Sequence, residues 1–256
     1  MGAPEVAERG VLRANLTTLY ERVDAARARG ASASPRVTVC IVTKAAPADA
    51  FDLLRSLGER EVGENRVQDA VSKRMSAPVG FTWHGIGHLQ TNKAKKALGV
   101  FDVFHALDRL PLAEALEPLL AAADRRWPVY AQVNAARDPG KSGVEPEKAI
   151  GLLEELTRFP HLEVVGLMTM AREDDRGERA RPTFRLLREV RDEAMRRGVG
   201  DLPPAGLSMG MSDDFEVAVE EGATVVRVGR AAWEGVGRDD PLDAGRGPRT
   251  VTPETP

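Results

Sequence analysis

The stretch VTVCIVT, residues 37–43, decides the fold. It is β-branched and almost wholly apolar, which is typical of a strand covered on both faces, as in a parallel sheet. Before it, apolar residues recur at helical spacing from about Val6 to Arg29, and Gly30 ends that pattern. We therefore expect a long N-terminal helix followed by the first strand of a parallel sheet.

Short strands alternate with helices along the rest of the chain. The further strands expected are Glu61–Gly63, Thr82–Ile86, Val100–His105, Val129–Asn134, Val164–Met168, Ala205–Ser208 and Thr224–Val228. The helical stretches between them are Pro47–Leu57, Val67–Met75, Thr91–Leu98, Leu110–Ala123, Glu145–Phe159, Arg179–Arg197 and Asp213–Glu220. This alternation over 256 residues predicts an α/β fold, a single (β/α)8 TIM barrel with an extra N-terminal helix. A doubly wound open sheet is the structural alternative.

Composition limits the classes of function. Hydrophobic residues make up 42% and charged residues 29%, so a sizeable core can form inside a well-solvated shell. The net charge of -3 argues against charge-driven nucleic-acid binding. We see neither a signal peptide nor an apolar run that could span a bilayer, and expect a soluble, cytoplasmic protein without a membrane partner. Residues 1–236 are expected to form the barrel, with no C-terminal β domain, and residues 237–256 a disordered tail.

Lys44 is the most informative residue of the expected barrel mouth, because active sites of such barrels lie at the C-terminal ends of the strands. It ends the first strand, so we expect its stem to lie in the mouth with little water around its amine. Desolvation disfavours the ammonium form and makes a lysine a better nucleophile, which suits an imine with an aldehyde. The alternative is a lysine that extends into solvent or neutralises Glu64.

The segments after the seventh and eighth strands are the usual phosphate site of such barrels. The candidate anchors are the Ser208 hydroxyl and the backbone N–H groups of Gly210, Gly229 and Arg230. Ser212 is expected to cap the helix that starts with Asp213 and Asp214, whose carboxylates would repel a phosphate placed at that helix end. Ordinary capping and tight turns are the alternative for this glycine-rich region.

Arg227 lies among valines in the eighth strand and needs an acceptor if it is buried, such as a ring nitrogen or a carboxylate. A structural ion pair with Glu64 is the alternative. The four histidines show no metal-ligand spacing, and a satisfied structural role is expected for each, so we expect no metal site. Cys40, the only cysteine, is expected to be a small buried core residue and not a reactive thiol.

Several motifs in the same order resemble the pyridoxal phosphate homeostasis protein family, also called alanine racemase N-terminal-domain-like, from roughly Val11 to Gly235. They are VTK at 42–44, GEN at 63–65, WHGIGHLQTNK at 83–93, KSG at 141–143, GLM at 166–168, LSMGMSDD at 207–214 and RVG at 227–229. The resemblance implies a fold-type III barrel that binds pyridoxal 5'-phosphate (PLP). It implies that Lys44 forms the Schiff base and that Arg227 faces the pyridine nitrogen. The other residues implied are Ser208, Gly229 and Arg230 at the phosphate, and Asn65 and Met168 along the cofactor pocket.

The sequence departs from the family pattern at two places beside these motifs. Lys44 is followed by Ala45, Ala46 and Pro47, where the family often has a polar residue and a second lysine. The position of Arg230 is commonly threonine, so one hydroxyl contact to the phosphate is missing. The backbone N–H at that position is unaffected by the change.

The resemblance implies a role in vitamin B6 homeostasis, with PLP held and released to apo-enzymes, and without catalytic residues. Racemases of this fold add a C-terminal β domain that supplies a catalytic tyrosine, and neither Tyr20 nor Tyr130 is placed as such a proton donor. Because that domain also dimerises racemases, we expect a monomer. A weak amino-acid racemase is the alternative, and a Schiff-base aldolase is disfavoured. Lys141 is a candidate transient acceptor of the aldehyde, or a loop lysine in water.

Overall fold

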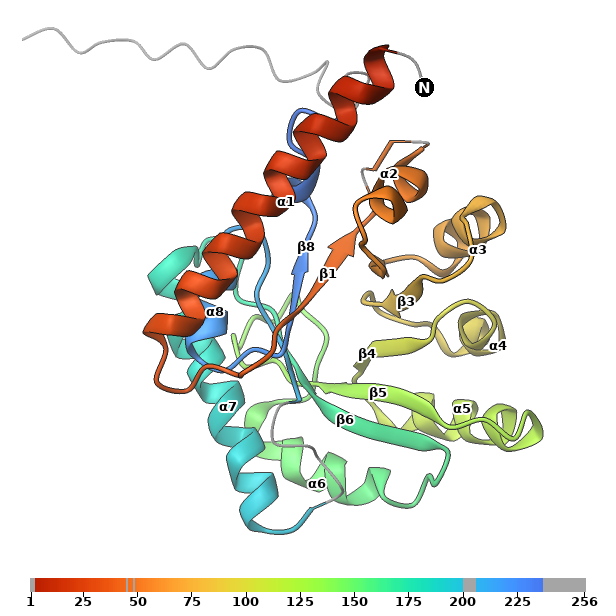
Figure 1. Ribbon diagram of the computed structural model, residues 1–256. Helices are drawn as coiled ribbons and strands as arrows, with labels where there is room; N and C mark the ends of the chain where they lie inside the picture. Colours follow the sequence, from red (N-terminus) through yellow and green to blue (C-terminus); the bar gives the residue numbers. More distant parts are fainter. Residues whose placement is uncertain (1–2, 45, 48, 200–205, 237–256) are drawn as a thin grey trace, which may run out of the picture.

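Eight parallel strands, β1 to β8, close into one barrel in sequence order in the computed structural model (Figure 1). The structure describes residues 3–44, 46–47, 49–199 and 206–236. The predicted TIM barrel is confirmed, and the alternative of an open sheet is wrong, because β1 pairs with both β2 and β8. The tail predicted for residues 237–256 lies outside the described residues.

The strands lie within a few residues of their predicted places. They are Thr38–Val42 (β1), Glu61–Glu64 (β2), Thr82–Gly85 (β3), Val103–Leu107 (β4), Trp127–Gln132 (β5), Leu162–Met168 (β6), Leu207–Ser208 (β7) and Val225–Val228 (β8). Residue 205, with which the seventh strand was predicted to begin, is not among the described residues.

Helices surround the barrel. They are Ala3–Arg29 (α1), Ala50–Ser56 (α2), Val67–Ser76 (α3), Ala94–Leu98 (α4), Leu110–Ala122 (α5), Pro146–Leu156 (α6), Arg181–Arg196 (α7), Phe215–Glu220 (α8) and Arg230–Trp233 (α9), with 3-10 turns at Thr91–Lys93 (η1) and Gly177–Ala180 (η2). The short helix α9 was not predicted. The helix predicted from Asp213 begins two residues later, at Phe215.

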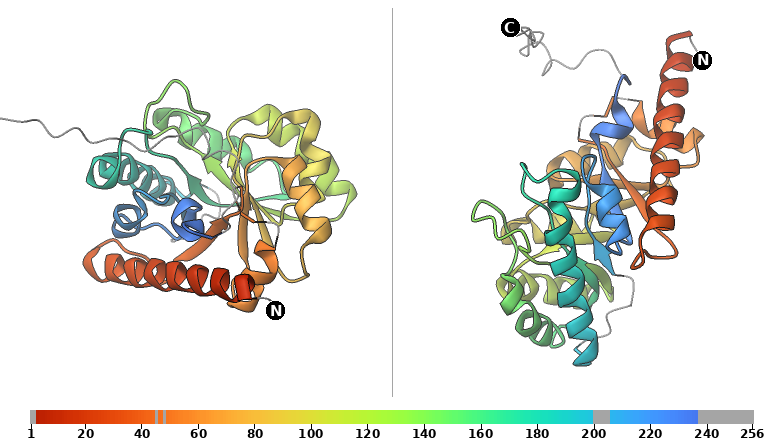
Figure 2. Two further views of the ribbon diagram at one scale, coloured as in Figure 1. Left: turned by 90° about the horizontal axis from the view of Figure 1, so that it is seen from above. Right: turned by 90° about the vertical axis from the view of Figure 1, so that its left-hand side faces the viewer.

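The extra helix α1 is part of the barrel's outer layer. It packs against α8 and α9 (Figure 2), and buries one face that contains Leu12, Leu16, Leu19 and Val23. Asn15 Nδ2 donates to the carbonyl oxygens of Ala232 at 3.0 Å and Glu234 at 2.8 Å. These contacts fix α1 against the segment that follows β8. No helix in the described ranges is both long and apolar enough to cross a membrane.

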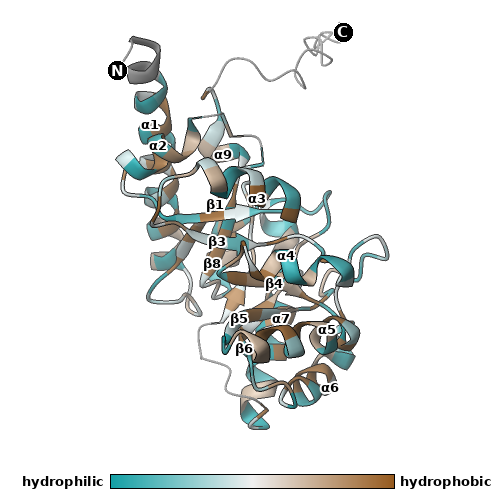
Figure 3. Ribbon diagram, turned by 90° about the vertical axis from the view of Figure 1, so that its right-hand side faces the viewer, coloured by the Kyte–Doolittle hydropathy of each residue, from teal (hydrophilic) through white to brown (hydrophobic). Residues whose placement is uncertain are grey.

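The main hydrophobic core lies between the strands and the helices. In Figure 3 β4 is largely apolar, whereas the helices around it mix apolar and hydrophilic residues. Inside the barrel a smaller buried cluster contains Cys40, Tyr130, Met168 and Val225. The predicted burial of Cys40 is confirmed. Several polar side chains are buried as well, among them His84, His105, Ser208 and Arg227. Two of these buried polar residues, Ser208 and Arg227, are candidate site residues.

Candidate functional site

The ends of β1 and β8 lie side by side, so the segments that follow them meet at one end of the barrel. The register pairs Cys40 with Arg227 and Ile41 with Val228. Trp233 Nε1 in α9 donates to the carbonyl oxygen of Val42 at 2.9 Å. A Cβ atom added to Gly229 would lie 3.4 Å from Val42 Cβ. The start of α9 is therefore fixed beside the end of β1, two residues before Lys44.

Lys44 is exposed, and the prediction that little water surrounds its amine is wrong. The strand ends at Val42 and the side chain of Thr43 is fully buried, which leaves Lys44 in the turn beyond it. The alternative that Lys44 neutralises Glu64 is not observed, because another lysine holds that carboxylate. Lys73 Nζ in α3 pairs with Glu64 and donates to the carbonyl oxygen of Thr43 at 2.5 Å.

The loop between β7 and α8 meets the start of α9. Ser212 Oγ accepts a hydrogen bond from the backbone N–H of Ala231 at 3.3 Å, so Ser212 does not cap α8 as predicted. Gly210 has a φ of +94° and its would-be Cβ lies 2.6 Å from Ala218 Cβ, so only glycine fits there. Ser212 was thus missed as a site residue. Its place between two glycine-containing turns was the available signal.

The two carboxylates after Ser212 are already engaged. Asp213 forms an ion pair with Arg230, and Arg176 Nε lies 3.8 Å from it. Asp214 Oδ1 accepts the backbone N–H of Met211 at 2.6 Å, and burial raises the pKa of Asp214. The repulsion of a phosphate that the sequence led us to expect is therefore reduced at this loop.

Ser208 lies inside the barrel and not in the loop around Ser212. It is fully buried. Its Oγ accepts from Arg227 Nη1 at 2.7 Å and is 2.7 Å from His105 Nδ1. The hydroxyl therefore has two polar partners within the barrel. The structure brings the end of β1, Ser212 and the start of α9 together, and places Ser208 inside the barrel beside Arg227.

Arg227 is almost completely buried, with 3% of its surface exposed. Besides Ser208, it donates from Nη2 to the carbonyl oxygen of Thr169 at 3.0 Å. Burial lowers the pKa of Arg227 to about 10. Within the described part of the chain it forms no ion pair, so the alternative of a salt bridge with Glu64 is not observed.

The remaining predicted residues differ in how deeply they are buried. Asn65 is exposed after β2, close to Gly87, where an added Cβ would lie 2.2 Å from Asn65 O. Met168 is fully buried at the end of β6. Lys141 Nζ donates to the carbonyl oxygen of Ala171, and its side chain is only 23% exposed, so it is not a lysine surrounded by water.

Each of the four histidines has a polar partner, as the predicted structural roles require. His84 and His105 contact one another in the barrel interior, with Nδ1 of the first 2.8 Å from Nε2 of the second. His105 also stacks on Tyr130, with ring centroids 4.4 Å apart. In the described ranges no group of three or more histidine, cysteine or acidic residues is arranged to hold a metal ion.

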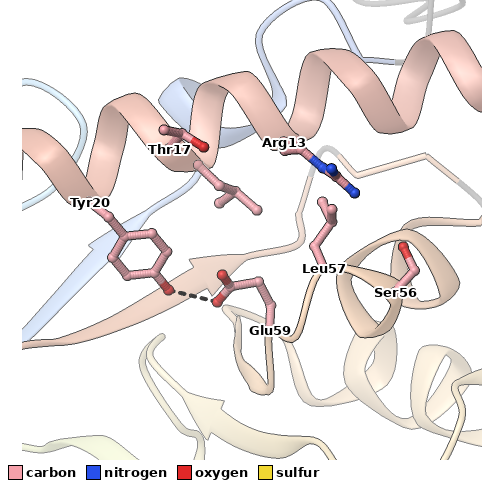
Figure 4. Close-up of a pocket in the computed structure, with 7 residues that line it drawn as sticks. Arg13, Thr17, Tyr20, Ser56, Leu57 and Glu59 are labelled. Atoms are coloured by element: carbon pink, nitrogen blue, oxygen red, sulfur yellow. Dashed lines mark hydrogen bonds between the residues drawn. The ribbon is translucent and has the colours of Figure 1, made fainter.

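A hollow of about 300 Å³ lies between α1 and the connection from α2 to β2 (Figure 4). Tyr20 borders it and donates its hydroxyl hydrogen to Glu59 Oε2 at 2.7 Å. None of the predicted site residues lines it. Tyr20 is therefore committed to the α1 side of the molecule.

Known proteins share this sequence and fold. The family described as alanine racemase, N-terminal domain, matches residues 14–235. The pyridoxal phosphate homeostasis protein of Aquifex aeolicus is 38% identical over 215 residues, which are 84% of this chain and 93% of that protein. The chain belongs to the pyridoxal phosphate homeostasis protein family. This confirms the resemblance predicted from the motifs.

Other members of the pyridoxal phosphate homeostasis protein family agree with this assignment. The human protein is 34% identical over 227 residues, which cover 84% of this chain and 82% of that protein. PipY of Synechococcus elongatus, in a structure with PLP bound, superposes with a TM-score of 0.74 at 31% identity. That match covers 86% of this chain and 99% of PipY.

Proposed function

We propose that this chain binds PLP through a Schiff base at Lys44 and acts in intracellular PLP homeostasis without turnover. One observation supports it most: α9 contacts the end of β1, so the segment that leads to Lys44 lies beside the loop to which we assign the phosphate. PLP has an aldehyde, a phosphate and a ring nitrogen, and each has a suitable group among these residues. The residues therefore fit the cofactor.

The phosphate is assigned to the loop around Ser212 and the start of α9. The Ser212 hydroxyl and the backbone N–H groups that begin at Gly229 are suitable donors. Arg230 adds a positive charge to this loop, although Asp213 shares it. Ser208 is better explained as a support for Arg227, because both of its hydrogen bonds are made within the barrel. Gly210 shapes the turn that places Ser212.

The ring nitrogen is assigned to Arg227. An arginine donates and does not accept, so a ring nitrogen that faces it stays unprotonated. PLP supplies an aldehyde and an electron sink when it is bound, and an unprotonated ring nitrogen weakens the sink. A buried guanidinium at this place therefore favours binding over carbanion chemistry.

Lys44 supplies the amine that condenses with the aldehyde and releases water. Because Lys44 is exposed, the amine is accessible to an incoming aldehyde, but burial does not assist its reactivity. The stability of the covalent bond then depends on the phosphate and ring contacts that keep the two groups together. Exposure of the amine also suits a protein that releases its cofactor to apo-enzymes.

Racemisation requires an acid and a base on opposite faces of the substrate Cα. The chain has two tyrosines, and both are described. Tyr20 bonds to Glu59 on the α1 side, and Tyr130 stacks on His105 inside the barrel. Both tyrosines thus have structural contacts, and we assign neither of them a role in proton transfer. We therefore favour a cytoplasmic, monomeric PLP carrier over a weak amino-acid racemase.

The test is borohydride reduction of the PLP-loaded protein, followed by peptide mapping. We expect a yellow protein whose visible band disappears on reduction, with the adduct on the peptide that contains Lys44. Lys44→Ala should lose the band and the adduct, whereas Lys148→Ala, at an exposed lysine in α6, should keep both. A protein that takes up no PLP, or an adduct elsewhere, would refute the proposal. Exchange of the alanine Cα hydrogen at enzyme-like rates would favour the racemase.

A further inference from the structure

Five side chains form a chain of hydrogen bonds through the barrel interior, from Arg227 in β8 to Glu61 at the start of β2. Ser208 Oγ lies 2.7 Å from Arg227 Nη1 and 2.7 Å from His105 Nδ1. His105 Nε2 lies 2.8 Å from His84 Nδ1, and His84 Nε2 lies 2.7 Å from Glu61 Oε2. The chain joins strands β8, β7, β4, β3 and β2. It links the buried guanidinium to a carboxylate at the opposite end of the barrel.

With both histidines neutral and Glu61 as a carboxylate, one arrangement of hydrogens satisfies every link. Arg227 has donors alone, so Ser208 Oγ accepts from it, and in this arrangement Ser208 gives its own hydrogen to His105 Nδ1. His105 then carries its hydrogen on Nε2 and donates to His84 Nδ1. His84 in turn donates from Nε2 to the Glu61 carboxylate. Both histidines are neutral in this arrangement, and all four bonds point from the arginine to the glutamate.

The charges around the chain agree with that arrangement. Burial, with the nearby His84 and Arg227, lowers the pKa of His105 well below its usual range, which keeps the ring neutral. A buried guanidinium is costly unless acceptors compensate it. In the described ranges Arg227 has no direct ion pair, and Asp214 is a carboxylate whose charge favours that of the guanidinium. Aligned hydrogen bonds strengthen one another in a low-dielectric interior.

We propose that Ser208, His105 and His84 are positioning residues that hold the Arg227 guanidinium in one orientation toward the cofactor ring, and that Glu61 sets the polarity of this chain from the far end of the barrel. The identity of the group that Arg227 faces rests on the proposed function. The direction of the chain does not, because it follows from the contacts within this protein and from the neutral state of the two histidines.

The first test uses the full-length protein without PLP. Nitrogen-15 NMR of the four histidine rings should show His105 as a neutral Nε2–H tautomer at about pH 6, where an ordinary histidine is largely protonated. Glu61→Gln should shift the ring signals of His105, although Glu61 does not contact His105. Glu163→Gln is the matched control, since Glu163 is an exposed glutamate at the start of β6. An Nδ1–H tautomer, or unmoved His105 signals in Glu61→Gln, would refute the directed chain.

The second test measures PLP binding by the same variants. Glu61→Gln should weaken PLP binding about threefold and shift its visible absorption band, because the guanidinium is less firmly held. Ser208→Ala, which breaks the link next to Arg227, should do the same to a larger extent, about tenfold. Glu163→Gln should match the wild type. Movement of the His105 signals with unchanged PLP affinity and absorption in Glu61→Gln and Ser208→Ala would refute the positioning role.

These readouts separate the inference from the proposed function. If the wild type takes up no PLP, the proposed function fails, while the histidine tautomers still decide whether the directed chain exists. Ser208→Ala provides a second break in the chain if Glu61→Gln does not fold, and its predicted effect on His105 is loss of the fixed tautomer.

Discussion

Lys44 and Arg227 are two cations on neighbouring strands of one barrel, and their surroundings are opposite. Lys44 lies one turn beyond the end of β1 and is exposed, whereas Arg227 lies inside β8 and is 3% exposed. Arg227 has a hydroxyl and a carbonyl as fixed acceptors. In the proposed function this difference separates two roles: one cation is free to react, and the other is held in place.

This separation depends on which lysine pairs with Glu64. The Glu64 carboxylate is buried next to the end of β1 and would attract any nearby amine. Lys73 from α3 occupies it, with Thr43 Oγ1 as a second donor at 2.5 Å. Lys44 is therefore left without this partner. The neighbouring helix α3, and not the strand itself, supplies the lysine that pairs with Glu64 and keeps Lys44 free of that carboxylate.

Lys73→Met should produce the largest effect. It leaves the Glu64 carboxylate buried with one donor, and removing one partner of a buried ion pair is strongly destabilising, so the free energy of unfolding should fall by about 2 to 3 kcal/mol. Glu64 then attracts Lys44, and the yield of the borohydride adduct at Lys44 should fall. Urea unfolding and peptide mapping measure the two effects.

Lys148→Met is the matched control, because Lys148 pairs with Glu145 at 2.9 Å on the surface, where both side chains are mostly exposed. It should change neither quantity measurably. Unchanged stability in Lys73→Met would show that Glu64 does not depend on Lys73. Unchanged adduct yield would show that Lys44 is free for another reason.

His105, which lies between Ser208 and His84 in the barrel interior, should make the stability of the protein depend on pH. Burial lowers the pKa of His105 in the folded state, so the unfolded state binds more protons below the ordinary histidine pKa. The contribution of neutral His105 to the free energy of unfolding is therefore fully present above about pH 6.5 and is lost as the pH falls below that value. Between pH 7 and pH 5 the loss due to His105 should be about 2 kcal/mol.

His105→Gln isolates this contribution, since glutamine does not titrate. The loss of unfolding free energy between pH 7 and pH 5 should be smaller in the variant than in the wild type by that amount. Equal losses in the two proteins would mean that His105 is protonated in the folded barrel, which would also contradict the hydrogen-bond directions that connect it to Arg227.

The barrel was predictable from the sequence, because apolar strands alternating with helices have few other solutions. The family motifs likewise predicted which segments meet at the mouth. The exposure of Lys44 was not predictable, since an apolar strand indicates burial up to its end but not where the chain turns. The burial of Ser208 beside Arg227 was not predictable either, because a two-residue strand does not reveal whether its serine faces the interior or the loop.

The interior chain shows a further limit of sequence patterns. His84 and His105 were expected to be satisfied structural residues, and each has its partners. Nothing in their spacing indicates that they contact one another, because they lie 21 residues apart on separate strands. Their shared inward face becomes evident only when the barrel closes and sets the register of β3 and β4.

Arg230 is a third cation at the mouth, intermediate between the other two, and its replacement should have the smallest effect. It is exposed and pairs with Asp213, at a position where the family commonly has threonine. In Arg230→Thr the backbone N–H remains, but Asp213 loses its main partner and repels the phosphate, so PLP affinity should fall about threefold. Arg230→Thr combined with Asp213→Asn should restore wild-type affinity, because the carboxylate charge is removed as well. If the PLP affinity of the double variant stays below that of the wild type, the guanidinium of Arg230 itself contacts the phosphate. Arg230 would then be a binding cation like Arg227, and its pair with Asp213 would not be its main role.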